Sequence, residues 1–131
     1  MTPVERARSL VGVRFRLQGR DPAVGLDCVG VVINAFELQR AAFPCDYNLR
    51  GHALAKVDAV MSRHFRRVSR PAAATGDVLV FRCGPDRLHL GVHGGEHLIQ
   101  ADALIGRVVE RPWPAEWPIA RAYRRRIRGL R

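Results

Sequence analysis

The spacing of apolar residues changes once along the chain, from intervals of three and four residues to alternation, and this change limits the possible folds. Residues 1–70 carry helix-like intervals, whereas residues 76–128 carry short alternating runs separated by Gly, Pro or Asp. Helices followed by strands predict an α+β domain in which one face of an antiparallel sheet packs on a central helix. A length of 131 residues fits one such domain, so we assign residues 1–131 to a single unit.

The first part of the chain predicts three helices and one long loop. A short amphipathic helix is expected over residues 3–12, and a loop with three glycines and one proline over residues 12–26. Residues 27–40, with the sequence DCVGVVINAFELQR, have helical length, an acidic N-cap candidate and a nearly continuous apolar surface. We interpret this segment as the central buried helix. A further helix is expected from residue 51 to residue 65.

The second part predicts a sheet, and its best-defined turn brings two polar side chains together. The runs of strand length cover residues 77–82, 88–93, 97–101, 107–111 and 119–127. Gly94-Gly95 fits a two-residue hairpin turn, in which pairing of His93 with Glu96 would set His89 opposite Gln100. Cross-strand partners have Cβ atoms about 4.5 to 5.5 Å apart, so the carboxamide oxygen could accept a hydrogen bond from the imidazole. Such a bond would fix the tautomer and orientation of the ring, as the third residue does in Cys-His and Ser-His enzymes.

Cys28 is the candidate nucleophile because it follows the N-cap candidate Asp27, in the first turn of the central helix. Free N–H groups and the helix dipole favour negative charge there, so a thiolate would be stabilised. With a histidine nearby, such a site can lower a cysteine pKa from about 8.5 into the range of about 3.5 to 7.5. A buried structural cysteine is the alternative interpretation. Cys45 and Cys83 start no helix and are interpreted as structural, and the three cysteines predict no disulfide framework.

The other histidines are given no catalytic role. His93 and His97 flank the turn and are expected to be solvated, whereas His52 and His64 lie at the ends of a predicted helix. His89 and His93 share a strand face, but no further ligand pattern accompanies them. We therefore expect no metal site.

A net charge of +10 makes polyanions candidate partners, namely nucleic acid, an anionic cell-wall polymer or an acidic protein. Six arginines lie within residues 121–131. The simpler interpretation is a solvated edge strand protected by charge, and the more specific alternative is a surface that binds the phosphate backbone of nucleic acid. Tyr123 is the single aromatic residue of that run, which disfavours a nucleic acid partner. The first fifteen residues lack the apolar core of a secretory signal, and no run of about 18 apolar residues predicts a membrane span.

Several blocks of the sequence resemble the NlpC-type cell-wall peptidases, and especially the short version encoded with phage tails and gene transfer agents. The block GVRFRLQGRDPAVGLDCVG is similar to the segment that leads to the nucleophile in that family, with Asp27, Cys28 and Gly30 in the expected order. The block GDVLVFRCGPDRLHLGV is similar to its strand, turn and histidine region, and HLIQA to the strand that bears its third polar residue.

The resemblance implies a papain-like α+β fold with Cys28 as nucleophile, His89 as general base and then acid, and Gln100 as orienting residue. It also implies hydrolysis of amide bonds in peptidoglycan stem peptides, typically beside D-glutamate and diaminopimelate, with no metal or organic cofactor. Phage-tail or gene-transfer-agent proteins are the implied partners. A chain made in the bacterial cytoplasm without a signal peptide would then be carried in a phage-like tail.

Three positions depart from the pattern of the family. Phe15 stands where many relatives have Tyr and can donate no hydrogen bond to an oxyanion, Val29 stands where many have Ser, and Gln100 where phage-type relatives often have His. We therefore expect backbone N–H groups near the nucleophile to hold the oxyanion, in a neighbourhood formed by Phe15, Asp27 and Val29.

Other interpretations of the sequence remain open. One is a tail-assembly or tail-tip adaptor that keeps the fold without catalysis, and another is a nucleic-acid-binding module built on the arginine-rich end. A third is a different papain-like reaction, such as acyl transfer, on a substrate outside the cell wall. The presence of Cys28, His89 and Gln100 together favours the peptidase.

Overall fold

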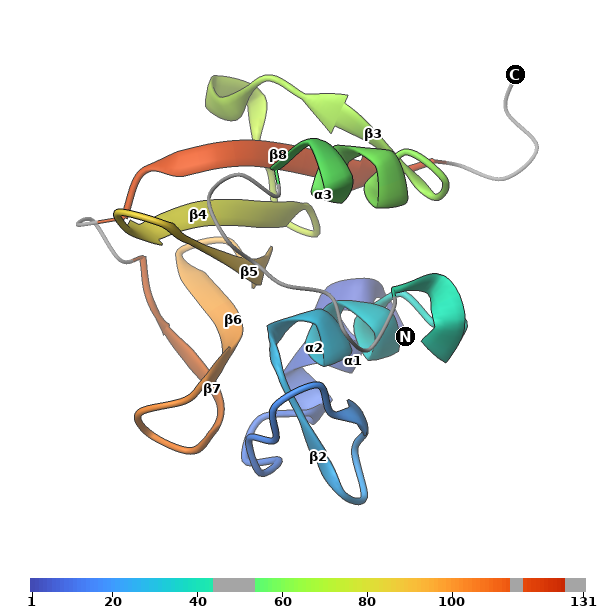
Figure 1. The fold of residues 1–131 in the computed structure, drawn as a ribbon, viewed down its shortest axis with the longest axis vertical. Helices are drawn as coiled ribbons and strands as arrows, with labels where there is room; N and C mark the ends of the chain where they lie inside the picture. The colour runs from blue at the N-terminus through green and yellow to red at the C-terminus, as the bar shows by residue number, and fades with distance from the viewer. Residues whose placement is uncertain (44–53, 114–116, 127–131) are drawn as a thin grey trace.

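The computed structural model describes residues 1–43, 54–113 and 117–126, which form a group of helices beside a twisted antiparallel sheet (Figure 1). In chain order the elements are α1 (Pro3–Ser9), β1 (Arg20–Asp21), β2 (Gly25–Leu26), α2 (Cys28–Ala35), η1 (Arg40–Ala42), α3 (Leu54–Met61), β3 (Phe65–Val68), η3 (Arg70–Ala72), β4 (Val78–Gly84), β5 (Arg87–His93), β6 (His97–Asp102), β7 (Arg107–Pro112) and β8 (Ile119–Arg125). The large sheet has the order β3-β8-β4-β5-β6-β7, and the predicted combination of early helices with a later antiparallel sheet is confirmed.

The first helix begins where its sequence predicts. The Thr2 hydroxyl accepts a hydrogen bond from Glu5 N–H at 3.1 Å, and the Glu5 carboxylate accepts one from Thr2 N–H at 2.9 Å. This reciprocal pair is a capping box, and Pro3 fits the first helical position because its missing N–H would have no partner there. α1 packs on α2 and also contacts β5, and Arg8 Nη2 donates to Gly94 O in the turn between β5 and β6 at 2.9 Å.

The central helix starts at the predicted residue but ends at Ala35, earlier than the predicted end near Arg40. Leu38 N–H donates to Ile33 O at 2.9 Å, and Glu37, with φ of 55°, donates from its N–H to Asn34 O at 3.4 Å. These two bonds form a Schellman motif, whose left-handed position is usually Gly. The sequence carries Glu37 there, and so gave no signal that the helix stops.

The predicted helix over residues 51–65 is wrong at its end. α3 ends at Met61, and Phe65 begins the strand β3, where it pairs with Arg125 of β8. Its ring packs edge-on against Phe36 with 4.9 Å between centroids. A phenylalanine four residues after Met61 fits the apolar spacing of a helix as well as a strand. Pairing with β8 therefore determined that Phe65 belongs to a strand. Residues 51–53 lie outside the described part of the chain.

The arginine-rich end was interpreted from the sequence as a solvated edge strand, and this interpretation is wrong. β8 lies between β3 and β4, and it pairs with both. Arg121 and Arg124 are held by carboxylates, with Arg121 Nε 3.2 Å from Asp58 Oδ1 and Arg124 Nη2 2.9 Å from Asp77 Oδ2. The other four predicted strands are confirmed as β4 to β7, and Ile127 lies outside the described residues.

Both faces of the large sheet are covered. One face carries the main core, where Leu90 and Val92 of β5 pack with residues of α1, α2 and α3. The opposite face carries a smaller cluster formed by Leu79, Phe81, Leu98 and Ala122, on which Trp113 and Trp117 pack. Alternate residues of β5 therefore point to different surroundings, which matters for the position of the candidate base.

Candidate active site

The hairpin between β5 and β6 turns one residue later than predicted. Gly94 N–H donates to His97 O at 2.8 Å, so the turn centres on Gly95, with φ of 96°, and the residue after it. The ladder that follows is displaced by two residues from the predicted register. Because side chains alternate with a period of two, this even displacement leaves His89 and Gln100 on the same face of the sheet.

The predicted contact between His89 and Gln100 is confirmed. Nε2 of His89 lies 2.6 Å from Oε1 of Gln100, and only 1% of Gln100 is exposed. A carboxamide oxygen only accepts, so Nε2 carries the proton and Nδ1 keeps a free lone pair. The hydrogen bond thus holds the neutral imidazole in the tautomer that a general base requires.

Asp27 fixes the start of α2 as the predicted N-cap. Its Oδ1 accepts hydrogen bonds from Gly30 N–H and from Arg20 Nη1, both at 2.8 Å, and its Oδ2 accepts one from Gln18 N–H at 3.1 Å. The Arg20 and Asp27 side chains are 7% and 14% exposed, so this ion pair is largely shielded from water. The segment of residues 18–20 and the first turn of α2 therefore meet at one carboxylate beside Cys28.

Gly30 allows the preceding loop to lie directly on the first turn of α2. A Cβ atom at this position would stand 2.2 Å from Gly19 O and 3.1 Å from Leu26 Cδ2. Neither the carbonyl nor the buried leucine can retreat without moving the loop that carries Arg20. The glycine of the DCVG motif thus has a packing role that follows from this close approach.

Cys28 lies where α2 contacts β5. It is 7% exposed, and the nearby backbone N–H groups of Leu90 and Val29 favour the charged form of the thiol. Leu90 follows His89 in β5, but strand alternation places the imidazole on the other face from the leucine side chain. Within the described residues, no hydrogen bond joins Cys28 to His89.

Burial, with a smaller contribution from the charge of Asp27, raises the pKa of the Cys28 thiol to about 12. The amides of Leu90 and Val29 and the charge of Arg20 act in the opposite direction, but they are weaker. This balance is opposite to the predicted stabilisation of a thiolate at the helix start. In the substrate-free chain, desolvation outweighs the helix dipole and Cys28 is a neutral thiol.

Trp117 packs against the candidate base, a contact that the sequence analysis missed. Its ring lies 5.5 Å from the His89 ring in an edge-to-face arrangement, and the guanidinium carbon of Arg111 lies 5.8 Å from its centroid. Burial lowers the pKa of His89 below 6.5, although the hydrogen bond to Gln100 acts in the opposite direction. Both tryptophans of the chain lie within residues 113–117, and this local concentration was a usable signal.

His93 is buried, whereas the sequence predicted that it would be solvated. It is 9% exposed, its Nδ1 accepts a hydrogen bond from Gly95 N–H at 3.0 Å, and its ring lies 4.7 Å from the Trp113 ring. Trp113 Nε1 also donates to Gly95 O at 2.9 Å. The displaced turn folds over His93 and gives it a structural role. His97 is exposed, as predicted.

The two remaining residues of the predicted oxyanion neighbourhood differ in what they offer. Phe15 is half-buried against the main core, and its N–H is used by Gly106 O at 2.8 Å. Val29 is 2% exposed, and its N–H favours the charged form of the neighbouring Cys28 thiol. Val29 N–H lies beside the thiol, whereas Gly30 N–H is already bound to Asp27 Oδ1, and Phe15 supplies apolar surface.

The other sequence assignments place no further group at this site. Cys83 is half-buried, with Sγ 3.8 Å from Arg87 O, and His64 is exposed, while Cys45 and His52 lie outside the described residues. In the described ranges no three His, Cys, Asp or Glu side chains are grouped closely enough to hold a metal ion. None of the described helices has both the length and the apolar character needed to cross a membrane.

Comparison with known structures identifies the fold. The chain is similar to NlpC1 from Trichomonas vaginalis (TM-score 0.66, 17% identity) over 94% of its length and 44% of that protein. It is also similar to NlpC2 from Trichomonas vaginalis (TM-score 0.65, 14% identity) over 93% of its length and 46% of that protein. A third similar structure is the peptidoglycan hydrolase RipB from Mycobacterium tuberculosis (TM-score 0.61, 22% identity), which matches 94% of this chain and 62% of that protein. The chain thus spans less than two thirds of each of these proteins. No protein-family model and no curated protein matches the sequence.

Proposed function

We propose that this chain is a papain-like cysteine peptidase that hydrolyses amide bonds in peptidoglycan stem peptides, with Cys28 as nucleophile, His89 as base and Gln100 as orienting residue. The observation that supports this most strongly is the 2.6 Å hydrogen bond between His89 and Gln100, formed beside a helix that starts with a cysteine. The likeness of the fold to the peptidoglycan hydrolase RipB supports the substrate class.

The first half of the reaction follows from the protonation states. Because the substrate-free thiol and imidazole are both neutral, the proton of Cys28 passes to Nδ1 of His89 as the sulfur attacks the scissile carbonyl carbon. The carbonyl oxygen becomes an oxyanion, which the Val29 N–H at the start of α2 stabilises. The imidazolium then protonates the amine as the C–N bond breaks, and a thioester remains on Cys28.

The second half regenerates the thiol. His89 accepts a proton from a water molecule, whose oxygen attacks the thioester carbon, and the same proton then returns to the departing sulfur. Through both halves Gln100 Oε1 accepts a hydrogen bond from Nε2–H, so Nδ1 is the ring nitrogen that takes up and releases the proton. Burial lowers the pKa of His89, which keeps the ring neutral and ready to accept a proton at neutral pH.

The finer assignments rest on the sequence resemblance. We infer cleavage beside D-glutamate and diaminopimelate, and delivery as a component of a phage-like tail or gene transfer agent, where local digestion of the wall would assist DNA entry. The net charge of +10 favours approach to an anionic cell wall. Tail proteins would then be the assembly partners.

Mass spectrometry of stem-peptide fragments tests the proposal. Wild type, Cys28→Ala and the matched control Cys83→Ala are incubated with purified stem peptides under reducing conditions. We expect wild type and Cys83→Ala to give the same product and Cys28→Ala to give none. Cys83 suits the control because it lies on β4, with its thiol near a backbone carbonyl and outside the candidate active site. Product from Cys28→Ala would refute the assignment of the nucleophile.

A non-catalytic adaptor of the tail is the second candidate function. The observation in its favour is that Cys28 is nearly enclosed and neutral, as a structural cysteine would be. An adaptor would bind tail components equally well as wild type and as Cys28→Ala, and neither protein would cleave stem peptides. Stable binding without cleavage would therefore replace the peptidase assignment.

A further inference from the structure

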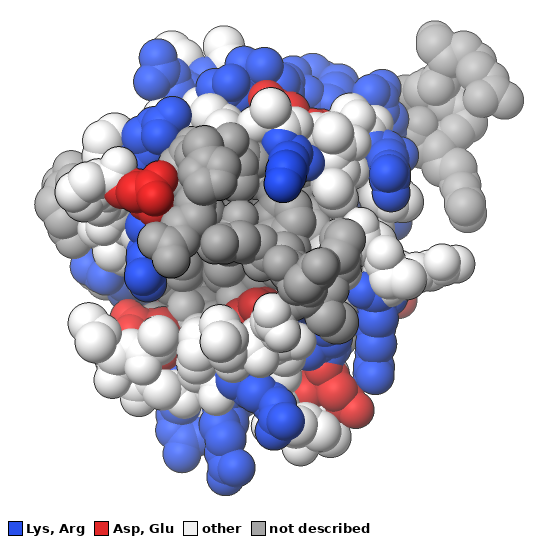
Figure 2. Space-filling view, viewed as in Figure 1, with Lys and Arg blue, Asp and Glu red and all other residues white. Residues whose placement is uncertain are grey.

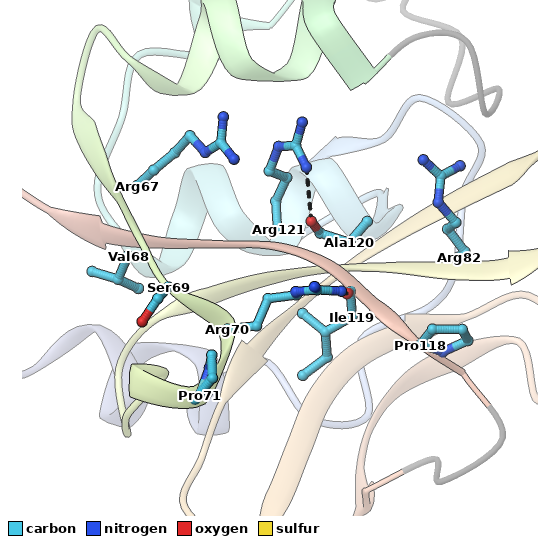
Figure 3. A pocket seen from close by; sticks show the side chains of 10 residues that line it. All are labelled: Arg67, Val68, Ser69, Arg70, Pro71, Arg82, Pro118, Ile119, Ala120 and Arg121. Atoms are coloured by element: carbon cyan, nitrogen blue, oxygen red, sulfur yellow. Dashed lines mark hydrogen bonds between the residues drawn. The ribbon is translucent and has the colours of Figure 1, made fainter.

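A pocket of about 450 Å³ lies beside the first strands of the large sheet and shares no residue with the candidate active site. It is lined by residues 67–71, from β3 and the turn after it, by Arg82 of β4 and by residues 118–121 at the start of β8 (Figure 3). β3, β8 and β4 are consecutive neighbours in the sheet, so the pocket spans three strands. Its size is within the range of small-molecule sites.

Four arginines line this pocket, and no carboxylate does. Arg121 Nε lies 3.2 Å from Asp58 Oδ1, and Arg67 Nη1 lies 3.8 Å from the other oxygen of the same carboxylate. Arg70 Nη1 donates to a backbone carbonyl at 3.2 Å. The Arg82 side chain has no hydrogen bond or ion pair with any described residue. One carboxylate outside the lining thus offsets four guanidinium groups.

The arginines are arranged in a row rather than around a point. Figure 3 shows the side chains of Arg67, Arg121 and Arg82 extending on the same side of the ribbon, each from a different strand, with Arg70 lying along β8 below them. Arg67 pairs with Tyr123 of β8, whereas Arg82 N–H donates to Pro118 O just before β8, so the outer two arginines are separated along the strands as well as across them. In Figure 2, Lys and Arg side chains also gather along the edge formed by α3, β3 and β8. Such a row suits an anion with repeated charges.

Guanidinium groups pair with phosphate, as with carboxylate, through two parallel hydrogen bonds, so these four side chains suit an anion such as a phosphodiester. The apolar lining consists of Val68, Pro71, Pro118, Ile119 and Ala120 and contains no aromatic ring. Proteins that bind single-stranded nucleic acid normally stack its bases on aromatic side chains. The lining therefore favours a phosphate polymer that carries no bases.

We propose that this pocket binds the phosphate groups of a base-free polyanion of the cell envelope, a polyol linked by phosphodiesters. The pocket chemistry stands by itself, and only the choice of an envelope polymer rests on the proposed function. Because the pocket and the candidate active site share no residue, a bound polymer would hold the protein on the wall while Cys28 acts on stem peptides.

Fluorescence anisotropy with labelled poly(glycerol phosphate) tests the proposal at several salt concentrations. We expect Arg82→Gln and Arg70→Gln each to weaken binding about tenfold and to reduce the slope of log affinity against log salt, since each removes one phosphate contact. Arg63→Gln is the matched control, because this exposed arginine changes the net charge equally and does not line the pocket. Its affinity should stay within about twofold of wild type. Far-UV circular dichroism establishes that all three variants fold.

Three results would overturn the proposal: no binding at low salt, an equal loss of affinity in Arg63→Gln, or tighter binding of oligo-deoxythymidylate with the same number of phosphates. The last result would assign the pocket to nucleic acid. Cleavage of short stem peptides, measured on the same preparations, needs no polymer. Cleavage without polymer binding would therefore refute only the pocket, and polymer binding without cleavage would refute only the peptidase.

Discussion

Replacement of Asp27 tests whether the start of α2 is held by the buried ion pair or by the helix cap. Asp27→Ala removes the acceptor for Gly30 N–H and leaves the Arg20 guanidinium, 7% exposed, without its counter-ion. Loss of an N-cap costs about 1 kcal/mol, and breaking a buried pair costs about 3 to 5 kcal/mol. We therefore expect Asp27→Ala to lower the free energy of unfolding by about 4 to 6 kcal/mol. That is a large share of the roughly 7 to 20 kcal/mol expected for a domain of this size.

Two further variants separate the cap from the charge. Asp27→Asn keeps an oxygen for Gly30 N–H and Arg20, but it removes the negative charge and sets an NH2 group against Gln18 N–H. We expect it to cost about 2 to 3 kcal/mol, mostly because the guanidinium stays buried and unpaired. Arg20→Met combined with Asp27→Asn removes that charge as well, so the double variant should be more stable than Asp27→Asn alone.

Urea unfolding followed by far-UV circular dichroism measures these differences, at low and at high salt. A shielded ion pair is weakly screened, so the cost of Asp27→Ala should change little with salt. The reasoning fails if Asp27→Ala costs less than about 1 kcal/mol, or if the double variant is no more stable than Asp27→Asn. In either case the Arg20 charge would not be what holds the loop to the helix.

Four other predictions concern packing and the candidate base. Gly30→Ala should lower the free energy of unfolding in urea by about 1 to 3 kcal/mol, because its Cβ would meet a carbonyl oxygen at 2.2 Å. The matched control Gly84→Ala, whose Cβ has no neighbour nearer than 4.0 Å, should change the free energy little. Trp117→Ala should raise the pKa of His89 toward 6.5 in an NMR titration, since it removes part of the burial that lowers the pKa, and an unchanged or lower pKa would contradict this. With wild type, stem-peptide cleavage should therefore rise as pH increases through a pKa below 6.5, where His89 becomes neutral, and Trp117→Ala should shift that rise to higher pH. Gln100→Leu should lower kcat about 10- to 100-fold, equal to the 1 to 3 kcal/mol of one buried hydrogen bond, and kcat equal to wild type would exclude an orienting role.

The sequence by itself determined the elements that have a strong local signal. These elements depend on residues near each other in the chain. They are the capping residues before α1 and α2, the alternation in β4 to β8, and the placement of His89 and Gln100 on the same face of one hairpin. The two-residue period of side chains in a strand explains why the contact between His89 and Gln100 was predicted correctly although the predicted register was wrong. A displacement of two residues changes the partners across the hairpin but not the face on which each side chain lies.

Only the tertiary structure decided the features that depend on distant partners. Phe65 joined a strand because β8 was available to pair with it, and the arginine-rich β8 became an interior strand because Asp58 and Asp77 offset its charges. Enclosure by the packed core likewise made Cys28 a neutral thiol, where the helix start alone predicted a stabilised thiolate. The physical reason is common to all three: strand pairing, charge compensation and desolvation arise between segments far apart in sequence, and no local pattern records which segments will meet.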